Sequence, residues 1–151
     1  MTTELSSLYQ EVILDHNKRP RNFHRLDAAT NHADGHNPLC GDKLSVYLAL
    51  DGDVVRDIAF EGSGCAISKA SASMMTESLK GRTLQQAEAL FESFHALVTG
   101  RSRSGAGAAD LGKLVVFSGV REFPVRVKCA TLAWHTMRAA LENRLEPAST
   151  E

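Results

Sequence analysis

A predicted β-hairpin over residues 43–61 constrains the fold of this chain more than any other stretch. Apolar and polar residues alternate along residues 43–50, which is the period of a strand with one buried face. Asp51-Gly52-Asp53 predicts a tight turn, because Asp-Gly tolerates positive φ angles. The second strand is expected to direct three residues into the core: Val54, Ile58 and Phe60.

The open end of this hairpin gathers residues that can bind a metal. Cys40 and Asp42 come directly before the first strand, and Gly62-Ser63-Gly64-Cys65 follows the second. Because the strands are antiparallel, these residues are expected at the same end of the hairpin. The third thiol, Cys129, would have to arrive from a C-terminal helix.

The remaining elements are predicted mostly as helices, from their apolar spacing. They cover residues 4–16, residues 66–80, a stretch from the capping-box pattern at residues 83–86 to Gly100, and a C-terminal stretch reaching about residue 144. Part of residues 28–36 could add an edge strand, while residues 114–117 fit a strand or a helical turn. The small polar face of the second helix predicts that another element packs closely there; its members are Ser68, Ser71 and Ser73.

Composition limits the kind of protein that this can be. The 151 residues suit a single domain over residues 1–151, with a flexible loop around residues 101–110 and a tail that frays from about residue 146. The net charge is −1, from 17 basic and 18 acidic residues, so nothing in it favours nucleic acid or an anionic membrane as a partner. No apolar run approaches the roughly 20 residues of a membrane span, and the start lacks a signal-peptide pattern. We therefore expect a cytoplasmic protein with reduced thiols.

Three cysteines and one carboxylate form an allowed, although uncommon, zinc donor set. Cys65 and Cys129 are both expected at or just before helix N-termini, where the helix dipole favours thiolate. The spacing alone is a weak signal, and small cysteines packed in the core are an equally good interpretation. His36, four residues before Cys40, competes with Asp42 for the fourth position.

At these residues the chain resembles the U-type iron–sulfur cluster assembly proteins. The resemblance extends over about residues 5–143. It rests on the following motifs: Leu8-Tyr9 with Asp15-His16, Pro20-Arg21-Asn22, Asn37-Pro38-Leu39-Cys40-Gly41-Asp42, Phe60-Glu61-Gly62-Ser63-Gly64-Cys65-Ala66-Ile67-Ser68, Ala70-Ser71-Ala72-Ser73-Met74-Met75 and Val127-Lys128-Cys129-Ala130-Thr131-Leu132.

Within this family the chain is similar to the SufU-like branch rather than to the IscU-type scaffolds. Lys128 stands where the scaffolds have a histidine, the Leu-Pro-Pro-Val-Lys chaperone motif is absent, and the interval from Cys65 to Cys129 is longer. The resemblance implies an α+β fold, in which a small antiparallel sheet of about three strands packs against four to six helices. It also implies a helix over residues 111–118.

The resemblance further implies a zinc site formed by Cys40, Asp42, Cys65 and Cys129. In such proteins a pyridoxal-phosphate cysteine desulfurase of the SufS type passes persulfide sulfur to the residue matching Cys40, and a desulfurase histidine replaces that thiolate on zinc. Arg126 matches an arginine that contacts the desulfurase, and the sulfur then goes to a downstream cluster-assembly scaffold. The alternative is a scaffold, in which iron or a 2Fe–2S cluster is bound by the same ligands. The resemblance therefore does not decide whether the chain acts as an enzyme of the sulfurtransferase class.

Overall fold

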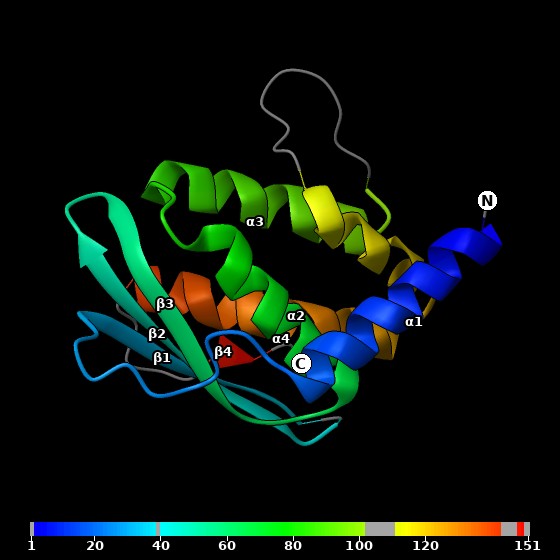
Figure 1. Ribbon diagram of the computed structural model, residues 1–151, viewed down its shortest axis with the longest axis horizontal. Helices are drawn as coiled ribbons and strands as arrows, with labels where there is room; N and C mark the ends of the chain where they lie inside the picture. Colours follow the sequence, from blue (N-terminus) through cyan, green and yellow to red (C-terminus); the bar gives the residue numbers. More distant parts are fainter. Residues whose placement is uncertain (1, 39, 102–110, 143–147, 150–151) are drawn as a thin grey trace.

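The computed structural model describes residues 2–38, 40–101, 111–142 and 148–149 (Figure 1). Three antiparallel strands and their covering helices form an α+β fold, which confirms the expected class. The elements in chain order are α1 (Thr2–Lys18), β1 (Asn31–Asn37), β2 (Asp42–Asp51), β3 (Val54–Ser63), α2 (Ala66–Leu79), α3 (Leu84–Val98), the 3₁₀ helix η1 (Gly112–Glu122), α4 (Pro124–Leu141) and β4 (Ala148–Ser149).

The sheet has the strand order β3-β2-β1-β4, and the two-residue β4 pairs in parallel with β1. The predicted hairpin is present, and Gly52 takes the positive φ of 62° that its turn requires. One detail of the prediction is wrong, because Val55 is buried and Val54 only half-buried. The register shifts between Ala49 and Leu50, because Arg56 of β3 has no partner on β2, and the inward face of β3 therefore changes over near the turn.

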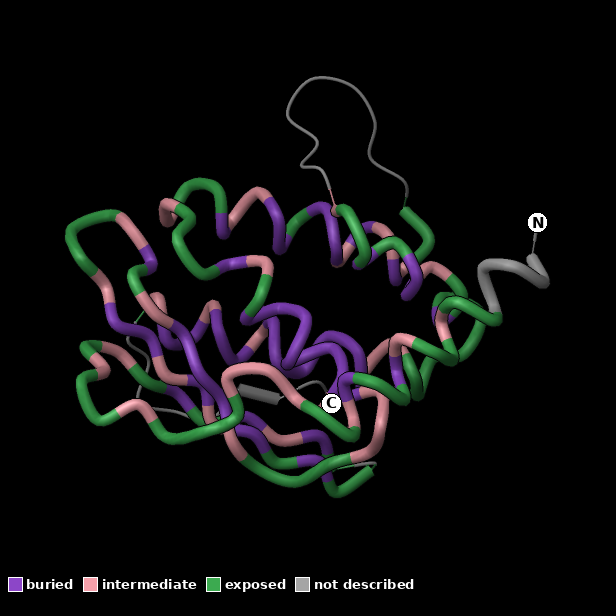
Figure 2. The backbone as a smooth tube through the Cα atoms, in the orientation of Figure 1, coloured by how far each residue is buried: buried purple, intermediate pink, exposed green. Residues whose placement is uncertain are grey.

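Helices α2 and α4 cover one face of the sheet, and the buried residues gather between these layers (Figures 1 and 2). The small residues predicted on α2 make this packing close. The Ser71 hydroxyl donates to the Ala130 carbonyl at 2.6 Å and accepts from Nε1 of Trp134 at 3.1 Å. The expectation of a closely packed neighbour is therefore confirmed, and the neighbour is α4.

Helix α1 lies against α2 and η1. Nδ1 of the buried His16 and the backbone N–H of Arg21 both reach the Ser73 hydroxyl, at 2.7 and 2.8 Å. The apolar stripe predicted for α1 is only partly buried, since Ile13 is 7 % exposed but Leu8 is 46 % exposed. The anchor of α1 is therefore polar as well as apolar.

The other predicted boundaries agree with local chemistry. The capping box of α3 is formed, with the Thr83 hydroxyl accepting from Gln86 N–H at 3.1 Å and the Gln86 side chain accepting from Thr83 N–H at 3.0 Å. Residues 114–117, left open between strand and helix, belong to η1 and bury Leu114 and Phe117. Within the described chain, no helix is both long and apolar enough to cross a membrane.

Two predicted segments have little or no described structure. The loop around residues 101–110 lies outside the described residues apart from Arg101. The tail from about residue 146 is described only at residues 148–149, which form β4. Helix α4 ends at Leu141, three residues before the predicted end.

Candidate metal centre

Cys40 lies in the tight turn between β1 and β2. The Asn37 carbonyl accepts from the backbone N–H groups of Cys40, at 3.2 Å, and Gly41, at 2.9 Å. Gly41 has a φ of 73°, and a Cβ built on it would meet no atom within 4 Å, so the turn borders open space. Cys40 is accordingly an exposed thiol on a turn.

Asp42 begins β2 and is completely buried. Its Oδ1 accepts the backbone N–H of Cys65 at 2.8 Å, which ties the β1–β2 turn to the start of α2. Two glycines make room for this contact. A Cβ on Gly64 would lie 2.9 Å from Oδ1 of Asp42, and a Cβ on Gly62, whose φ is 137°, would collide with the Lys43 carbonyl oxygen. The glycine-rich turn is therefore shaped around the buried carboxylate.

Cys65 is the N-cap of α2, which confirms the prediction that it lies at the start of a helix. Its Sγ accepts the Ser68 backbone N–H at 3.4 Å and lies 3.9 Å from Oδ2 of Asp42. A hydrogen bond from the Cys129 thiol lowers the pKa of Cys65 to about 7 against the opposing effect of burial, and the Ser68 N–H acts in the same direction. Cys65 therefore holds its thiolate form more easily than an ordinary cysteine.

Cys129 is buried, at 3 % exposure, in the second turn of α4. The prediction that it lies at or just before a helix N-terminus is wrong, because α4 already begins at Pro124, a residue that suits the first helical position. The pKa of Cys129 is raised by its hydrogen bond to Cys65 and by burial. Of these two thiols, Cys65 is thus the one that loses its proton first.

The hairpin and α4 bring these side chains into one cluster. The ligand atoms of Cys40, Asp42 and Cys129 all lie within 4.8 Å of one another, and the two sulfurs are 3.4 Å apart. Cys65 borders this group through its contact with Asp42. Three sulfurs and one carboxylate oxygen form a four-donor set that fits zinc, and buried thiolates need such a cation to offset their charge.

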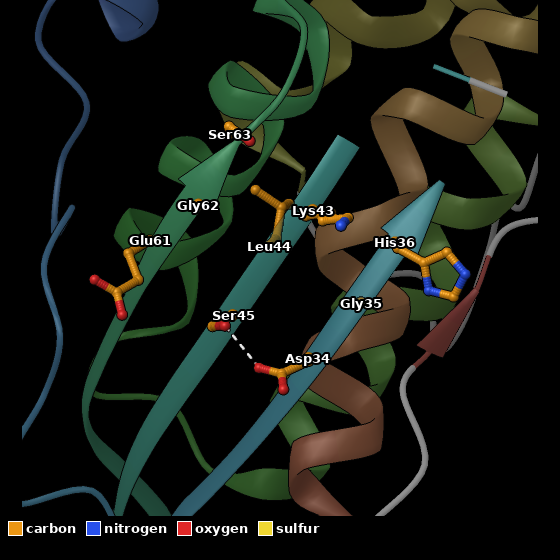
Figure 3. A pocket seen from close by; sticks show the side chains of 9 residues that line it. All are labelled: Asp34, Gly35, His36, Lys43, Leu44, Ser45, Glu61, Gly62 and Ser63. Atoms are coloured by element: carbon orange, nitrogen blue, oxygen red, sulfur yellow. Dashed lines mark hydrogen bonds between the residues drawn. The ribbon is translucent and has the colours of Figure 1, made fainter. Parts of the chain in front are cut away.

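None of the described histidines joins the group of Cys40, Asp42 and Cys129. His36 neighbours Asn37 on β1, but alternate residues of a strand face opposite ways, so His36 lies on the outer face of the sheet and Asn37 on the inner one. There it borders an open groove across β1, β2 and β3, in which Asp34 accepts from the Ser45 hydroxyl at 2.6 Å (Figure 3).

Arg126 lies in the first turn of α4, close in sequence to Cys129. Its guanidinium sits over the Phe123 ring, 4.5 Å from the ring centroid. Phe123 and Val125 beside it are 45 % and 51 % exposed. A cation and two apolar side chains therefore form one exposed surface next to the thiol cluster.

Comparison with known proteins places this geometry in a family. The model of the NifU-like N-terminal domain matches residues 8–130. This chain belongs to the NifU-like N-terminal domain family. The match spans all four predicted ligands and both strands of the hairpin.

Individual members of the NifU-like family carry two kinds of name. The zinc-dependent sulfurtransferase SufU of Bacillus subtilis is 43% identical over 133 residues, which is 88% of each chain. An iron–sulfur cluster assembly scaffold protein IscU of Streptococcus pyogenes is 39% identical over 140 residues, covering 93% of this chain and 86% of the relative. A putative iron–sulfur cluster assembly scaffold protein for the SUF system from Fervidobacterium islandicum has a crystal structure that superposes with a TM-score of 0.81 at 35% identity, covering 89% of this chain and 97% of that one.

Sequence reasoning missed three polar residues around the thiols of this NifU-like chain. The Asn37 amide points its Nδ2 at Cys129 Sγ, 3.8 Å away, although the sequence showed it only as a turn residue before Pro38. Tyr9 and Ser68 contribute buried hydroxyls near the same cluster. Both stand inside family motifs, but nothing in their spacing indicates where a hydroxyl points.

Proposed function

We propose that this chain is a zinc-dependent sulfurtransferase, which accepts persulfide sulfur on Cys40 from a cysteine desulfurase and passes it to iron–sulfur cluster assembly. The observation that supports this most is the contrast among the thiols. Cys40 is exposed on a turn, whereas Cys65 is half-buried at a helix start and Cys129 is buried inside a helix. A donor protein can reach Cys40 without unfolding the site.

The four proposed zinc ligands are Cys40, Asp42, Cys65 and Cys129. Zinc, when bound, holds thiols in the deprotonated form at neutral pH. Asp42 and Cys129 lie on regular elements and Cys65 caps α2, whereas Cys40 is exposed and precedes β2. The chain thereby keeps one nucleophile charged and shielded until a partner docks.

The transfer itself needs no external oxidant. The Cys40 thiolate attacks the terminal sulfur of the donor's persulfide, a new sulfur–sulfur bond forms on Cys40, and the donor's own sulfur–sulfur bond breaks. The donor cysteine leaves as a thiolate, so electrons and atoms balance. Cys65, whose pKa is lowered, is proposed as a fixed zinc ligand, whereas the attacking group is Cys40.

The proposed docking surface for the desulfurase is formed by Arg126, Phe123 and Val125. An arginine above an exposed aromatic ring is the kind of group that contributes most of the binding energy in protein interfaces. Arg126 and Val125 lie about one helical turn before Cys129, so a partner bound there would lie close to the thiols. We expect the partner to be a desulfurase of the SufS type, as the resemblance to SufU-like proteins implies.

Replacing Cys40 with Ala tests the proposal directly. The variant should no longer stimulate a cysteine desulfurase, because the acceptor sulfur is gone, while the fold should persist. A Ser63→Ala variant, which changes a hydroxyl next to the site but no proposed ligand, should stimulate like the wild type. Desulfurase stimulation by Cys40→Ala at the wild-type level would refute the assignment of Cys40.

A second function, assembly of a 2Fe–2S cluster on the same ligands, is favoured by the Streptococcus pyogenes relative named as a scaffold. Metal analysis separates the two. Protein purified without added iron should contain about one zinc per chain if it transfers sulfur. A visible cluster chromophore in place of zinc would favour the scaffold.

A further inference from the structure

Two buried hydroxyls near the thiol cluster lack hydrogen-bond partners in the described part of the chain. Among the described residues, only three buried side-chain N or O atoms are unpaired: the hydroxyl of Tyr9, the hydroxyl of Ser68 and Nε of Arg138. Arg138 Nε still lies 3.8 Å from a Glu88 carboxylate oxygen, which leaves the two hydroxyls to be explained. Buried donors almost always have acceptors, so these two need an explanation.

Ser68 departs from how other hydroxyls of the helices behave. In α2 and α4, the hydroxyls of Ser78, Thr131 and Thr136 each donate to the carbonyl four residues earlier, at 2.7 to 2.9 Å. Ser68 is completely buried in the first turn of α2, where its backbone N–H donates to Cys65 Sγ. The Ser68 hydroxyl, which has no partner among the described residues, therefore belongs to the residue whose backbone already contacts the Cys65 thiol.

Tyr9 approaches the same thiols from α1. Its half-buried ring packs edge-on against Phe117 at the border of the core, with 6.0 Å between centroids, and its hydroxyl is buried. Burial raises the pKa of Tyr9, Arg126 lowers it, and the Cys65 and Cys129 thiols raise it. These charges act on a phenol that lies on α1, the helix that packs against α2, and Cys65 caps α2.

We propose that the hydroxyls of Tyr9 and Ser68 are positioning groups that donate hydrogen bonds to the thiolates of the metal centre. A metal-bound thiolate carries no proton and accepts several hydrogen bonds, so it offers the acceptor that both hydroxyls lack. Such donors stabilise thiolate over thiol and fix the direction of the sulfur. The inference rests on the metal site of the proposed function but not on sulfur transfer.

Metal titration of four variants tests this inference. Tyr9→Phe and Ser68→Ala each delete one hydroxyl with little change in packing. Tyr47→Phe and Ser78→Ala are the matched controls, since the Tyr47 hydroxyl contacts Glu61 on the sheet's outer face and Ser78 bonds within α2. Zinc affinity, measured by competition with a chelator, should fall about tenfold for each test variant and stay unchanged in the controls.

Two further readouts separate positioning from a general structural role. The melting temperature of metal-free Tyr9→Phe and Ser68→Ala should stay constant or rise, because an unpaired buried hydroxyl is removed. In the cobalt-loaded variants, the sulfur-to-cobalt charge-transfer band should move to longer wavelength, because a thiolate without its donor is easier to oxidise.

The possible results are distinct. Unchanged zinc affinity in both test variants, or a weaker affinity together with a lower metal-free melting temperature, would overturn the inference. If the wild type binds no zinc, the inference and the metal site of the proposed function both fail. If the wild type binds zinc and the variants behave as expected, but no sulfur reaches Cys40, the inference stands and the proposed transfer fails.

Discussion

The two halves of α4 differ sharply in how they are packed. Its first turn carries the exposed side chains of Val125 and Arg126, and Cys129 follows in the second turn beside the other thiols. Its second half is almost fully buried, with Trp134 at 0 % exposure and stacked on Phe94 at a centroid distance of 4.6 Å. The first end of α4 therefore contributes to the exposed surface beside the thiols, and its second end is part of the hydrophobic core.

Polar groups follow the same division. In the buried half, Trp134 and Thr136 have hydrogen-bond partners within the fold. Around the first half, the hydroxyls of Tyr9 and Ser68 are unpaired among the described residues. Nε of Arg138, in the buried half, also lacks a hydrogen bond among the described residues but lies 3.8 Å from a Glu88 carboxylate oxygen, so the unpaired hydroxyls are those at the thiol end.

The largest expected effect lies at the core end. Trp134→Ala should destabilise the protein by about 3–5 kcal/mol, because it removes a stacked ring and leaves Ser71 without its donor. Val125→Ala, in the exposed half of the same helix, should change the unfolding free energy by less than about 0.5 kcal/mol. Urea denaturation measures both, and equal losses would remove the distinction between the two halves.

At the thiol end, Gly64→Ala should weaken zinc binding by about 10- to 100-fold. The added methyl would press on Oδ1 of Asp42 and disturb its bond to Cys65 N–H. Gly119→Ala is the matched control, because a Cβ there meets no atom within 4 Å. Zinc affinity equal to that of the control would show that the Asp42 position does not depend on this glycine.

Acid should destabilise the core end through His135. Burial, with the nearby charges of His95 and Arg138, lowers the pKa of His135 to about 4. Between about pH 6.5 and 4, the unfolded chain therefore binds more protons there than the folded chain, and stability falls as the pH falls.

After allowance for the partial exposure of His135, the unfolding free energy lost between pH 6.5 and 4 through this residue is about 2 kcal/mol. Denaturation of metal-free protein across this range should give a shallower pH slope for His135→Gln than for the wild type. The burial of His16 and His95, whose pKa values are also lowered, leaves part of the slope in the variant. Identical slopes would mean that His135 is freely protonated in the folded state.

The smallest effect is expected at the exposed turn of α4. Arg126→Ala should weaken binding to the desulfurase by about tenfold, roughly 1.4 kcal/mol, without changing the unfolding free energy. Arg56→Ala removes an exposed charge near the hairpin turn and serves as the control. Isothermal titration with the desulfurase distinguishes them, and equal affinities would place the docking surface elsewhere.

The sequence predicted the parts of the fold that local patterns determine. The hairpin followed from strict alternation and an Asp-Gly turn, and the α3 start followed from the Thr83–Gln86 pair. The exchange of Val54 for Val55 depended on a bulge in β3, where Arg56 has no partner on β2, and an alternating pattern does not reveal such an extra residue. The start of α4 was misjudged because the apolar stripe begins later than the helix.

Some residues of the candidate site could likewise be predicted from local sequence, and others could not. The meeting of Cys40, Asp42 and Cys65 could be predicted because one hairpin joins them along the chain. The arrival of Cys129 depends on how α4 packs on the sheet, and only the family resemblance indicated it. The positions of Tyr9 and Ser68 depend on contacts between α1, α2 and η1, which no sequence spacing encodes.

Mass spectrometry of Cys40 tests the central claim most directly. Zinc-loaded protein would be incubated with a cysteine desulfurase and cysteine, and its zinc content measured in the same sample. We predict one added sulfur atom on the peptide containing Cys40, none on those containing Cys65 or Cys129, and about one zinc per chain. Persulfide on Cys65 or Cys129 instead, or none on any cysteine while the desulfurase turns over, would contradict the account.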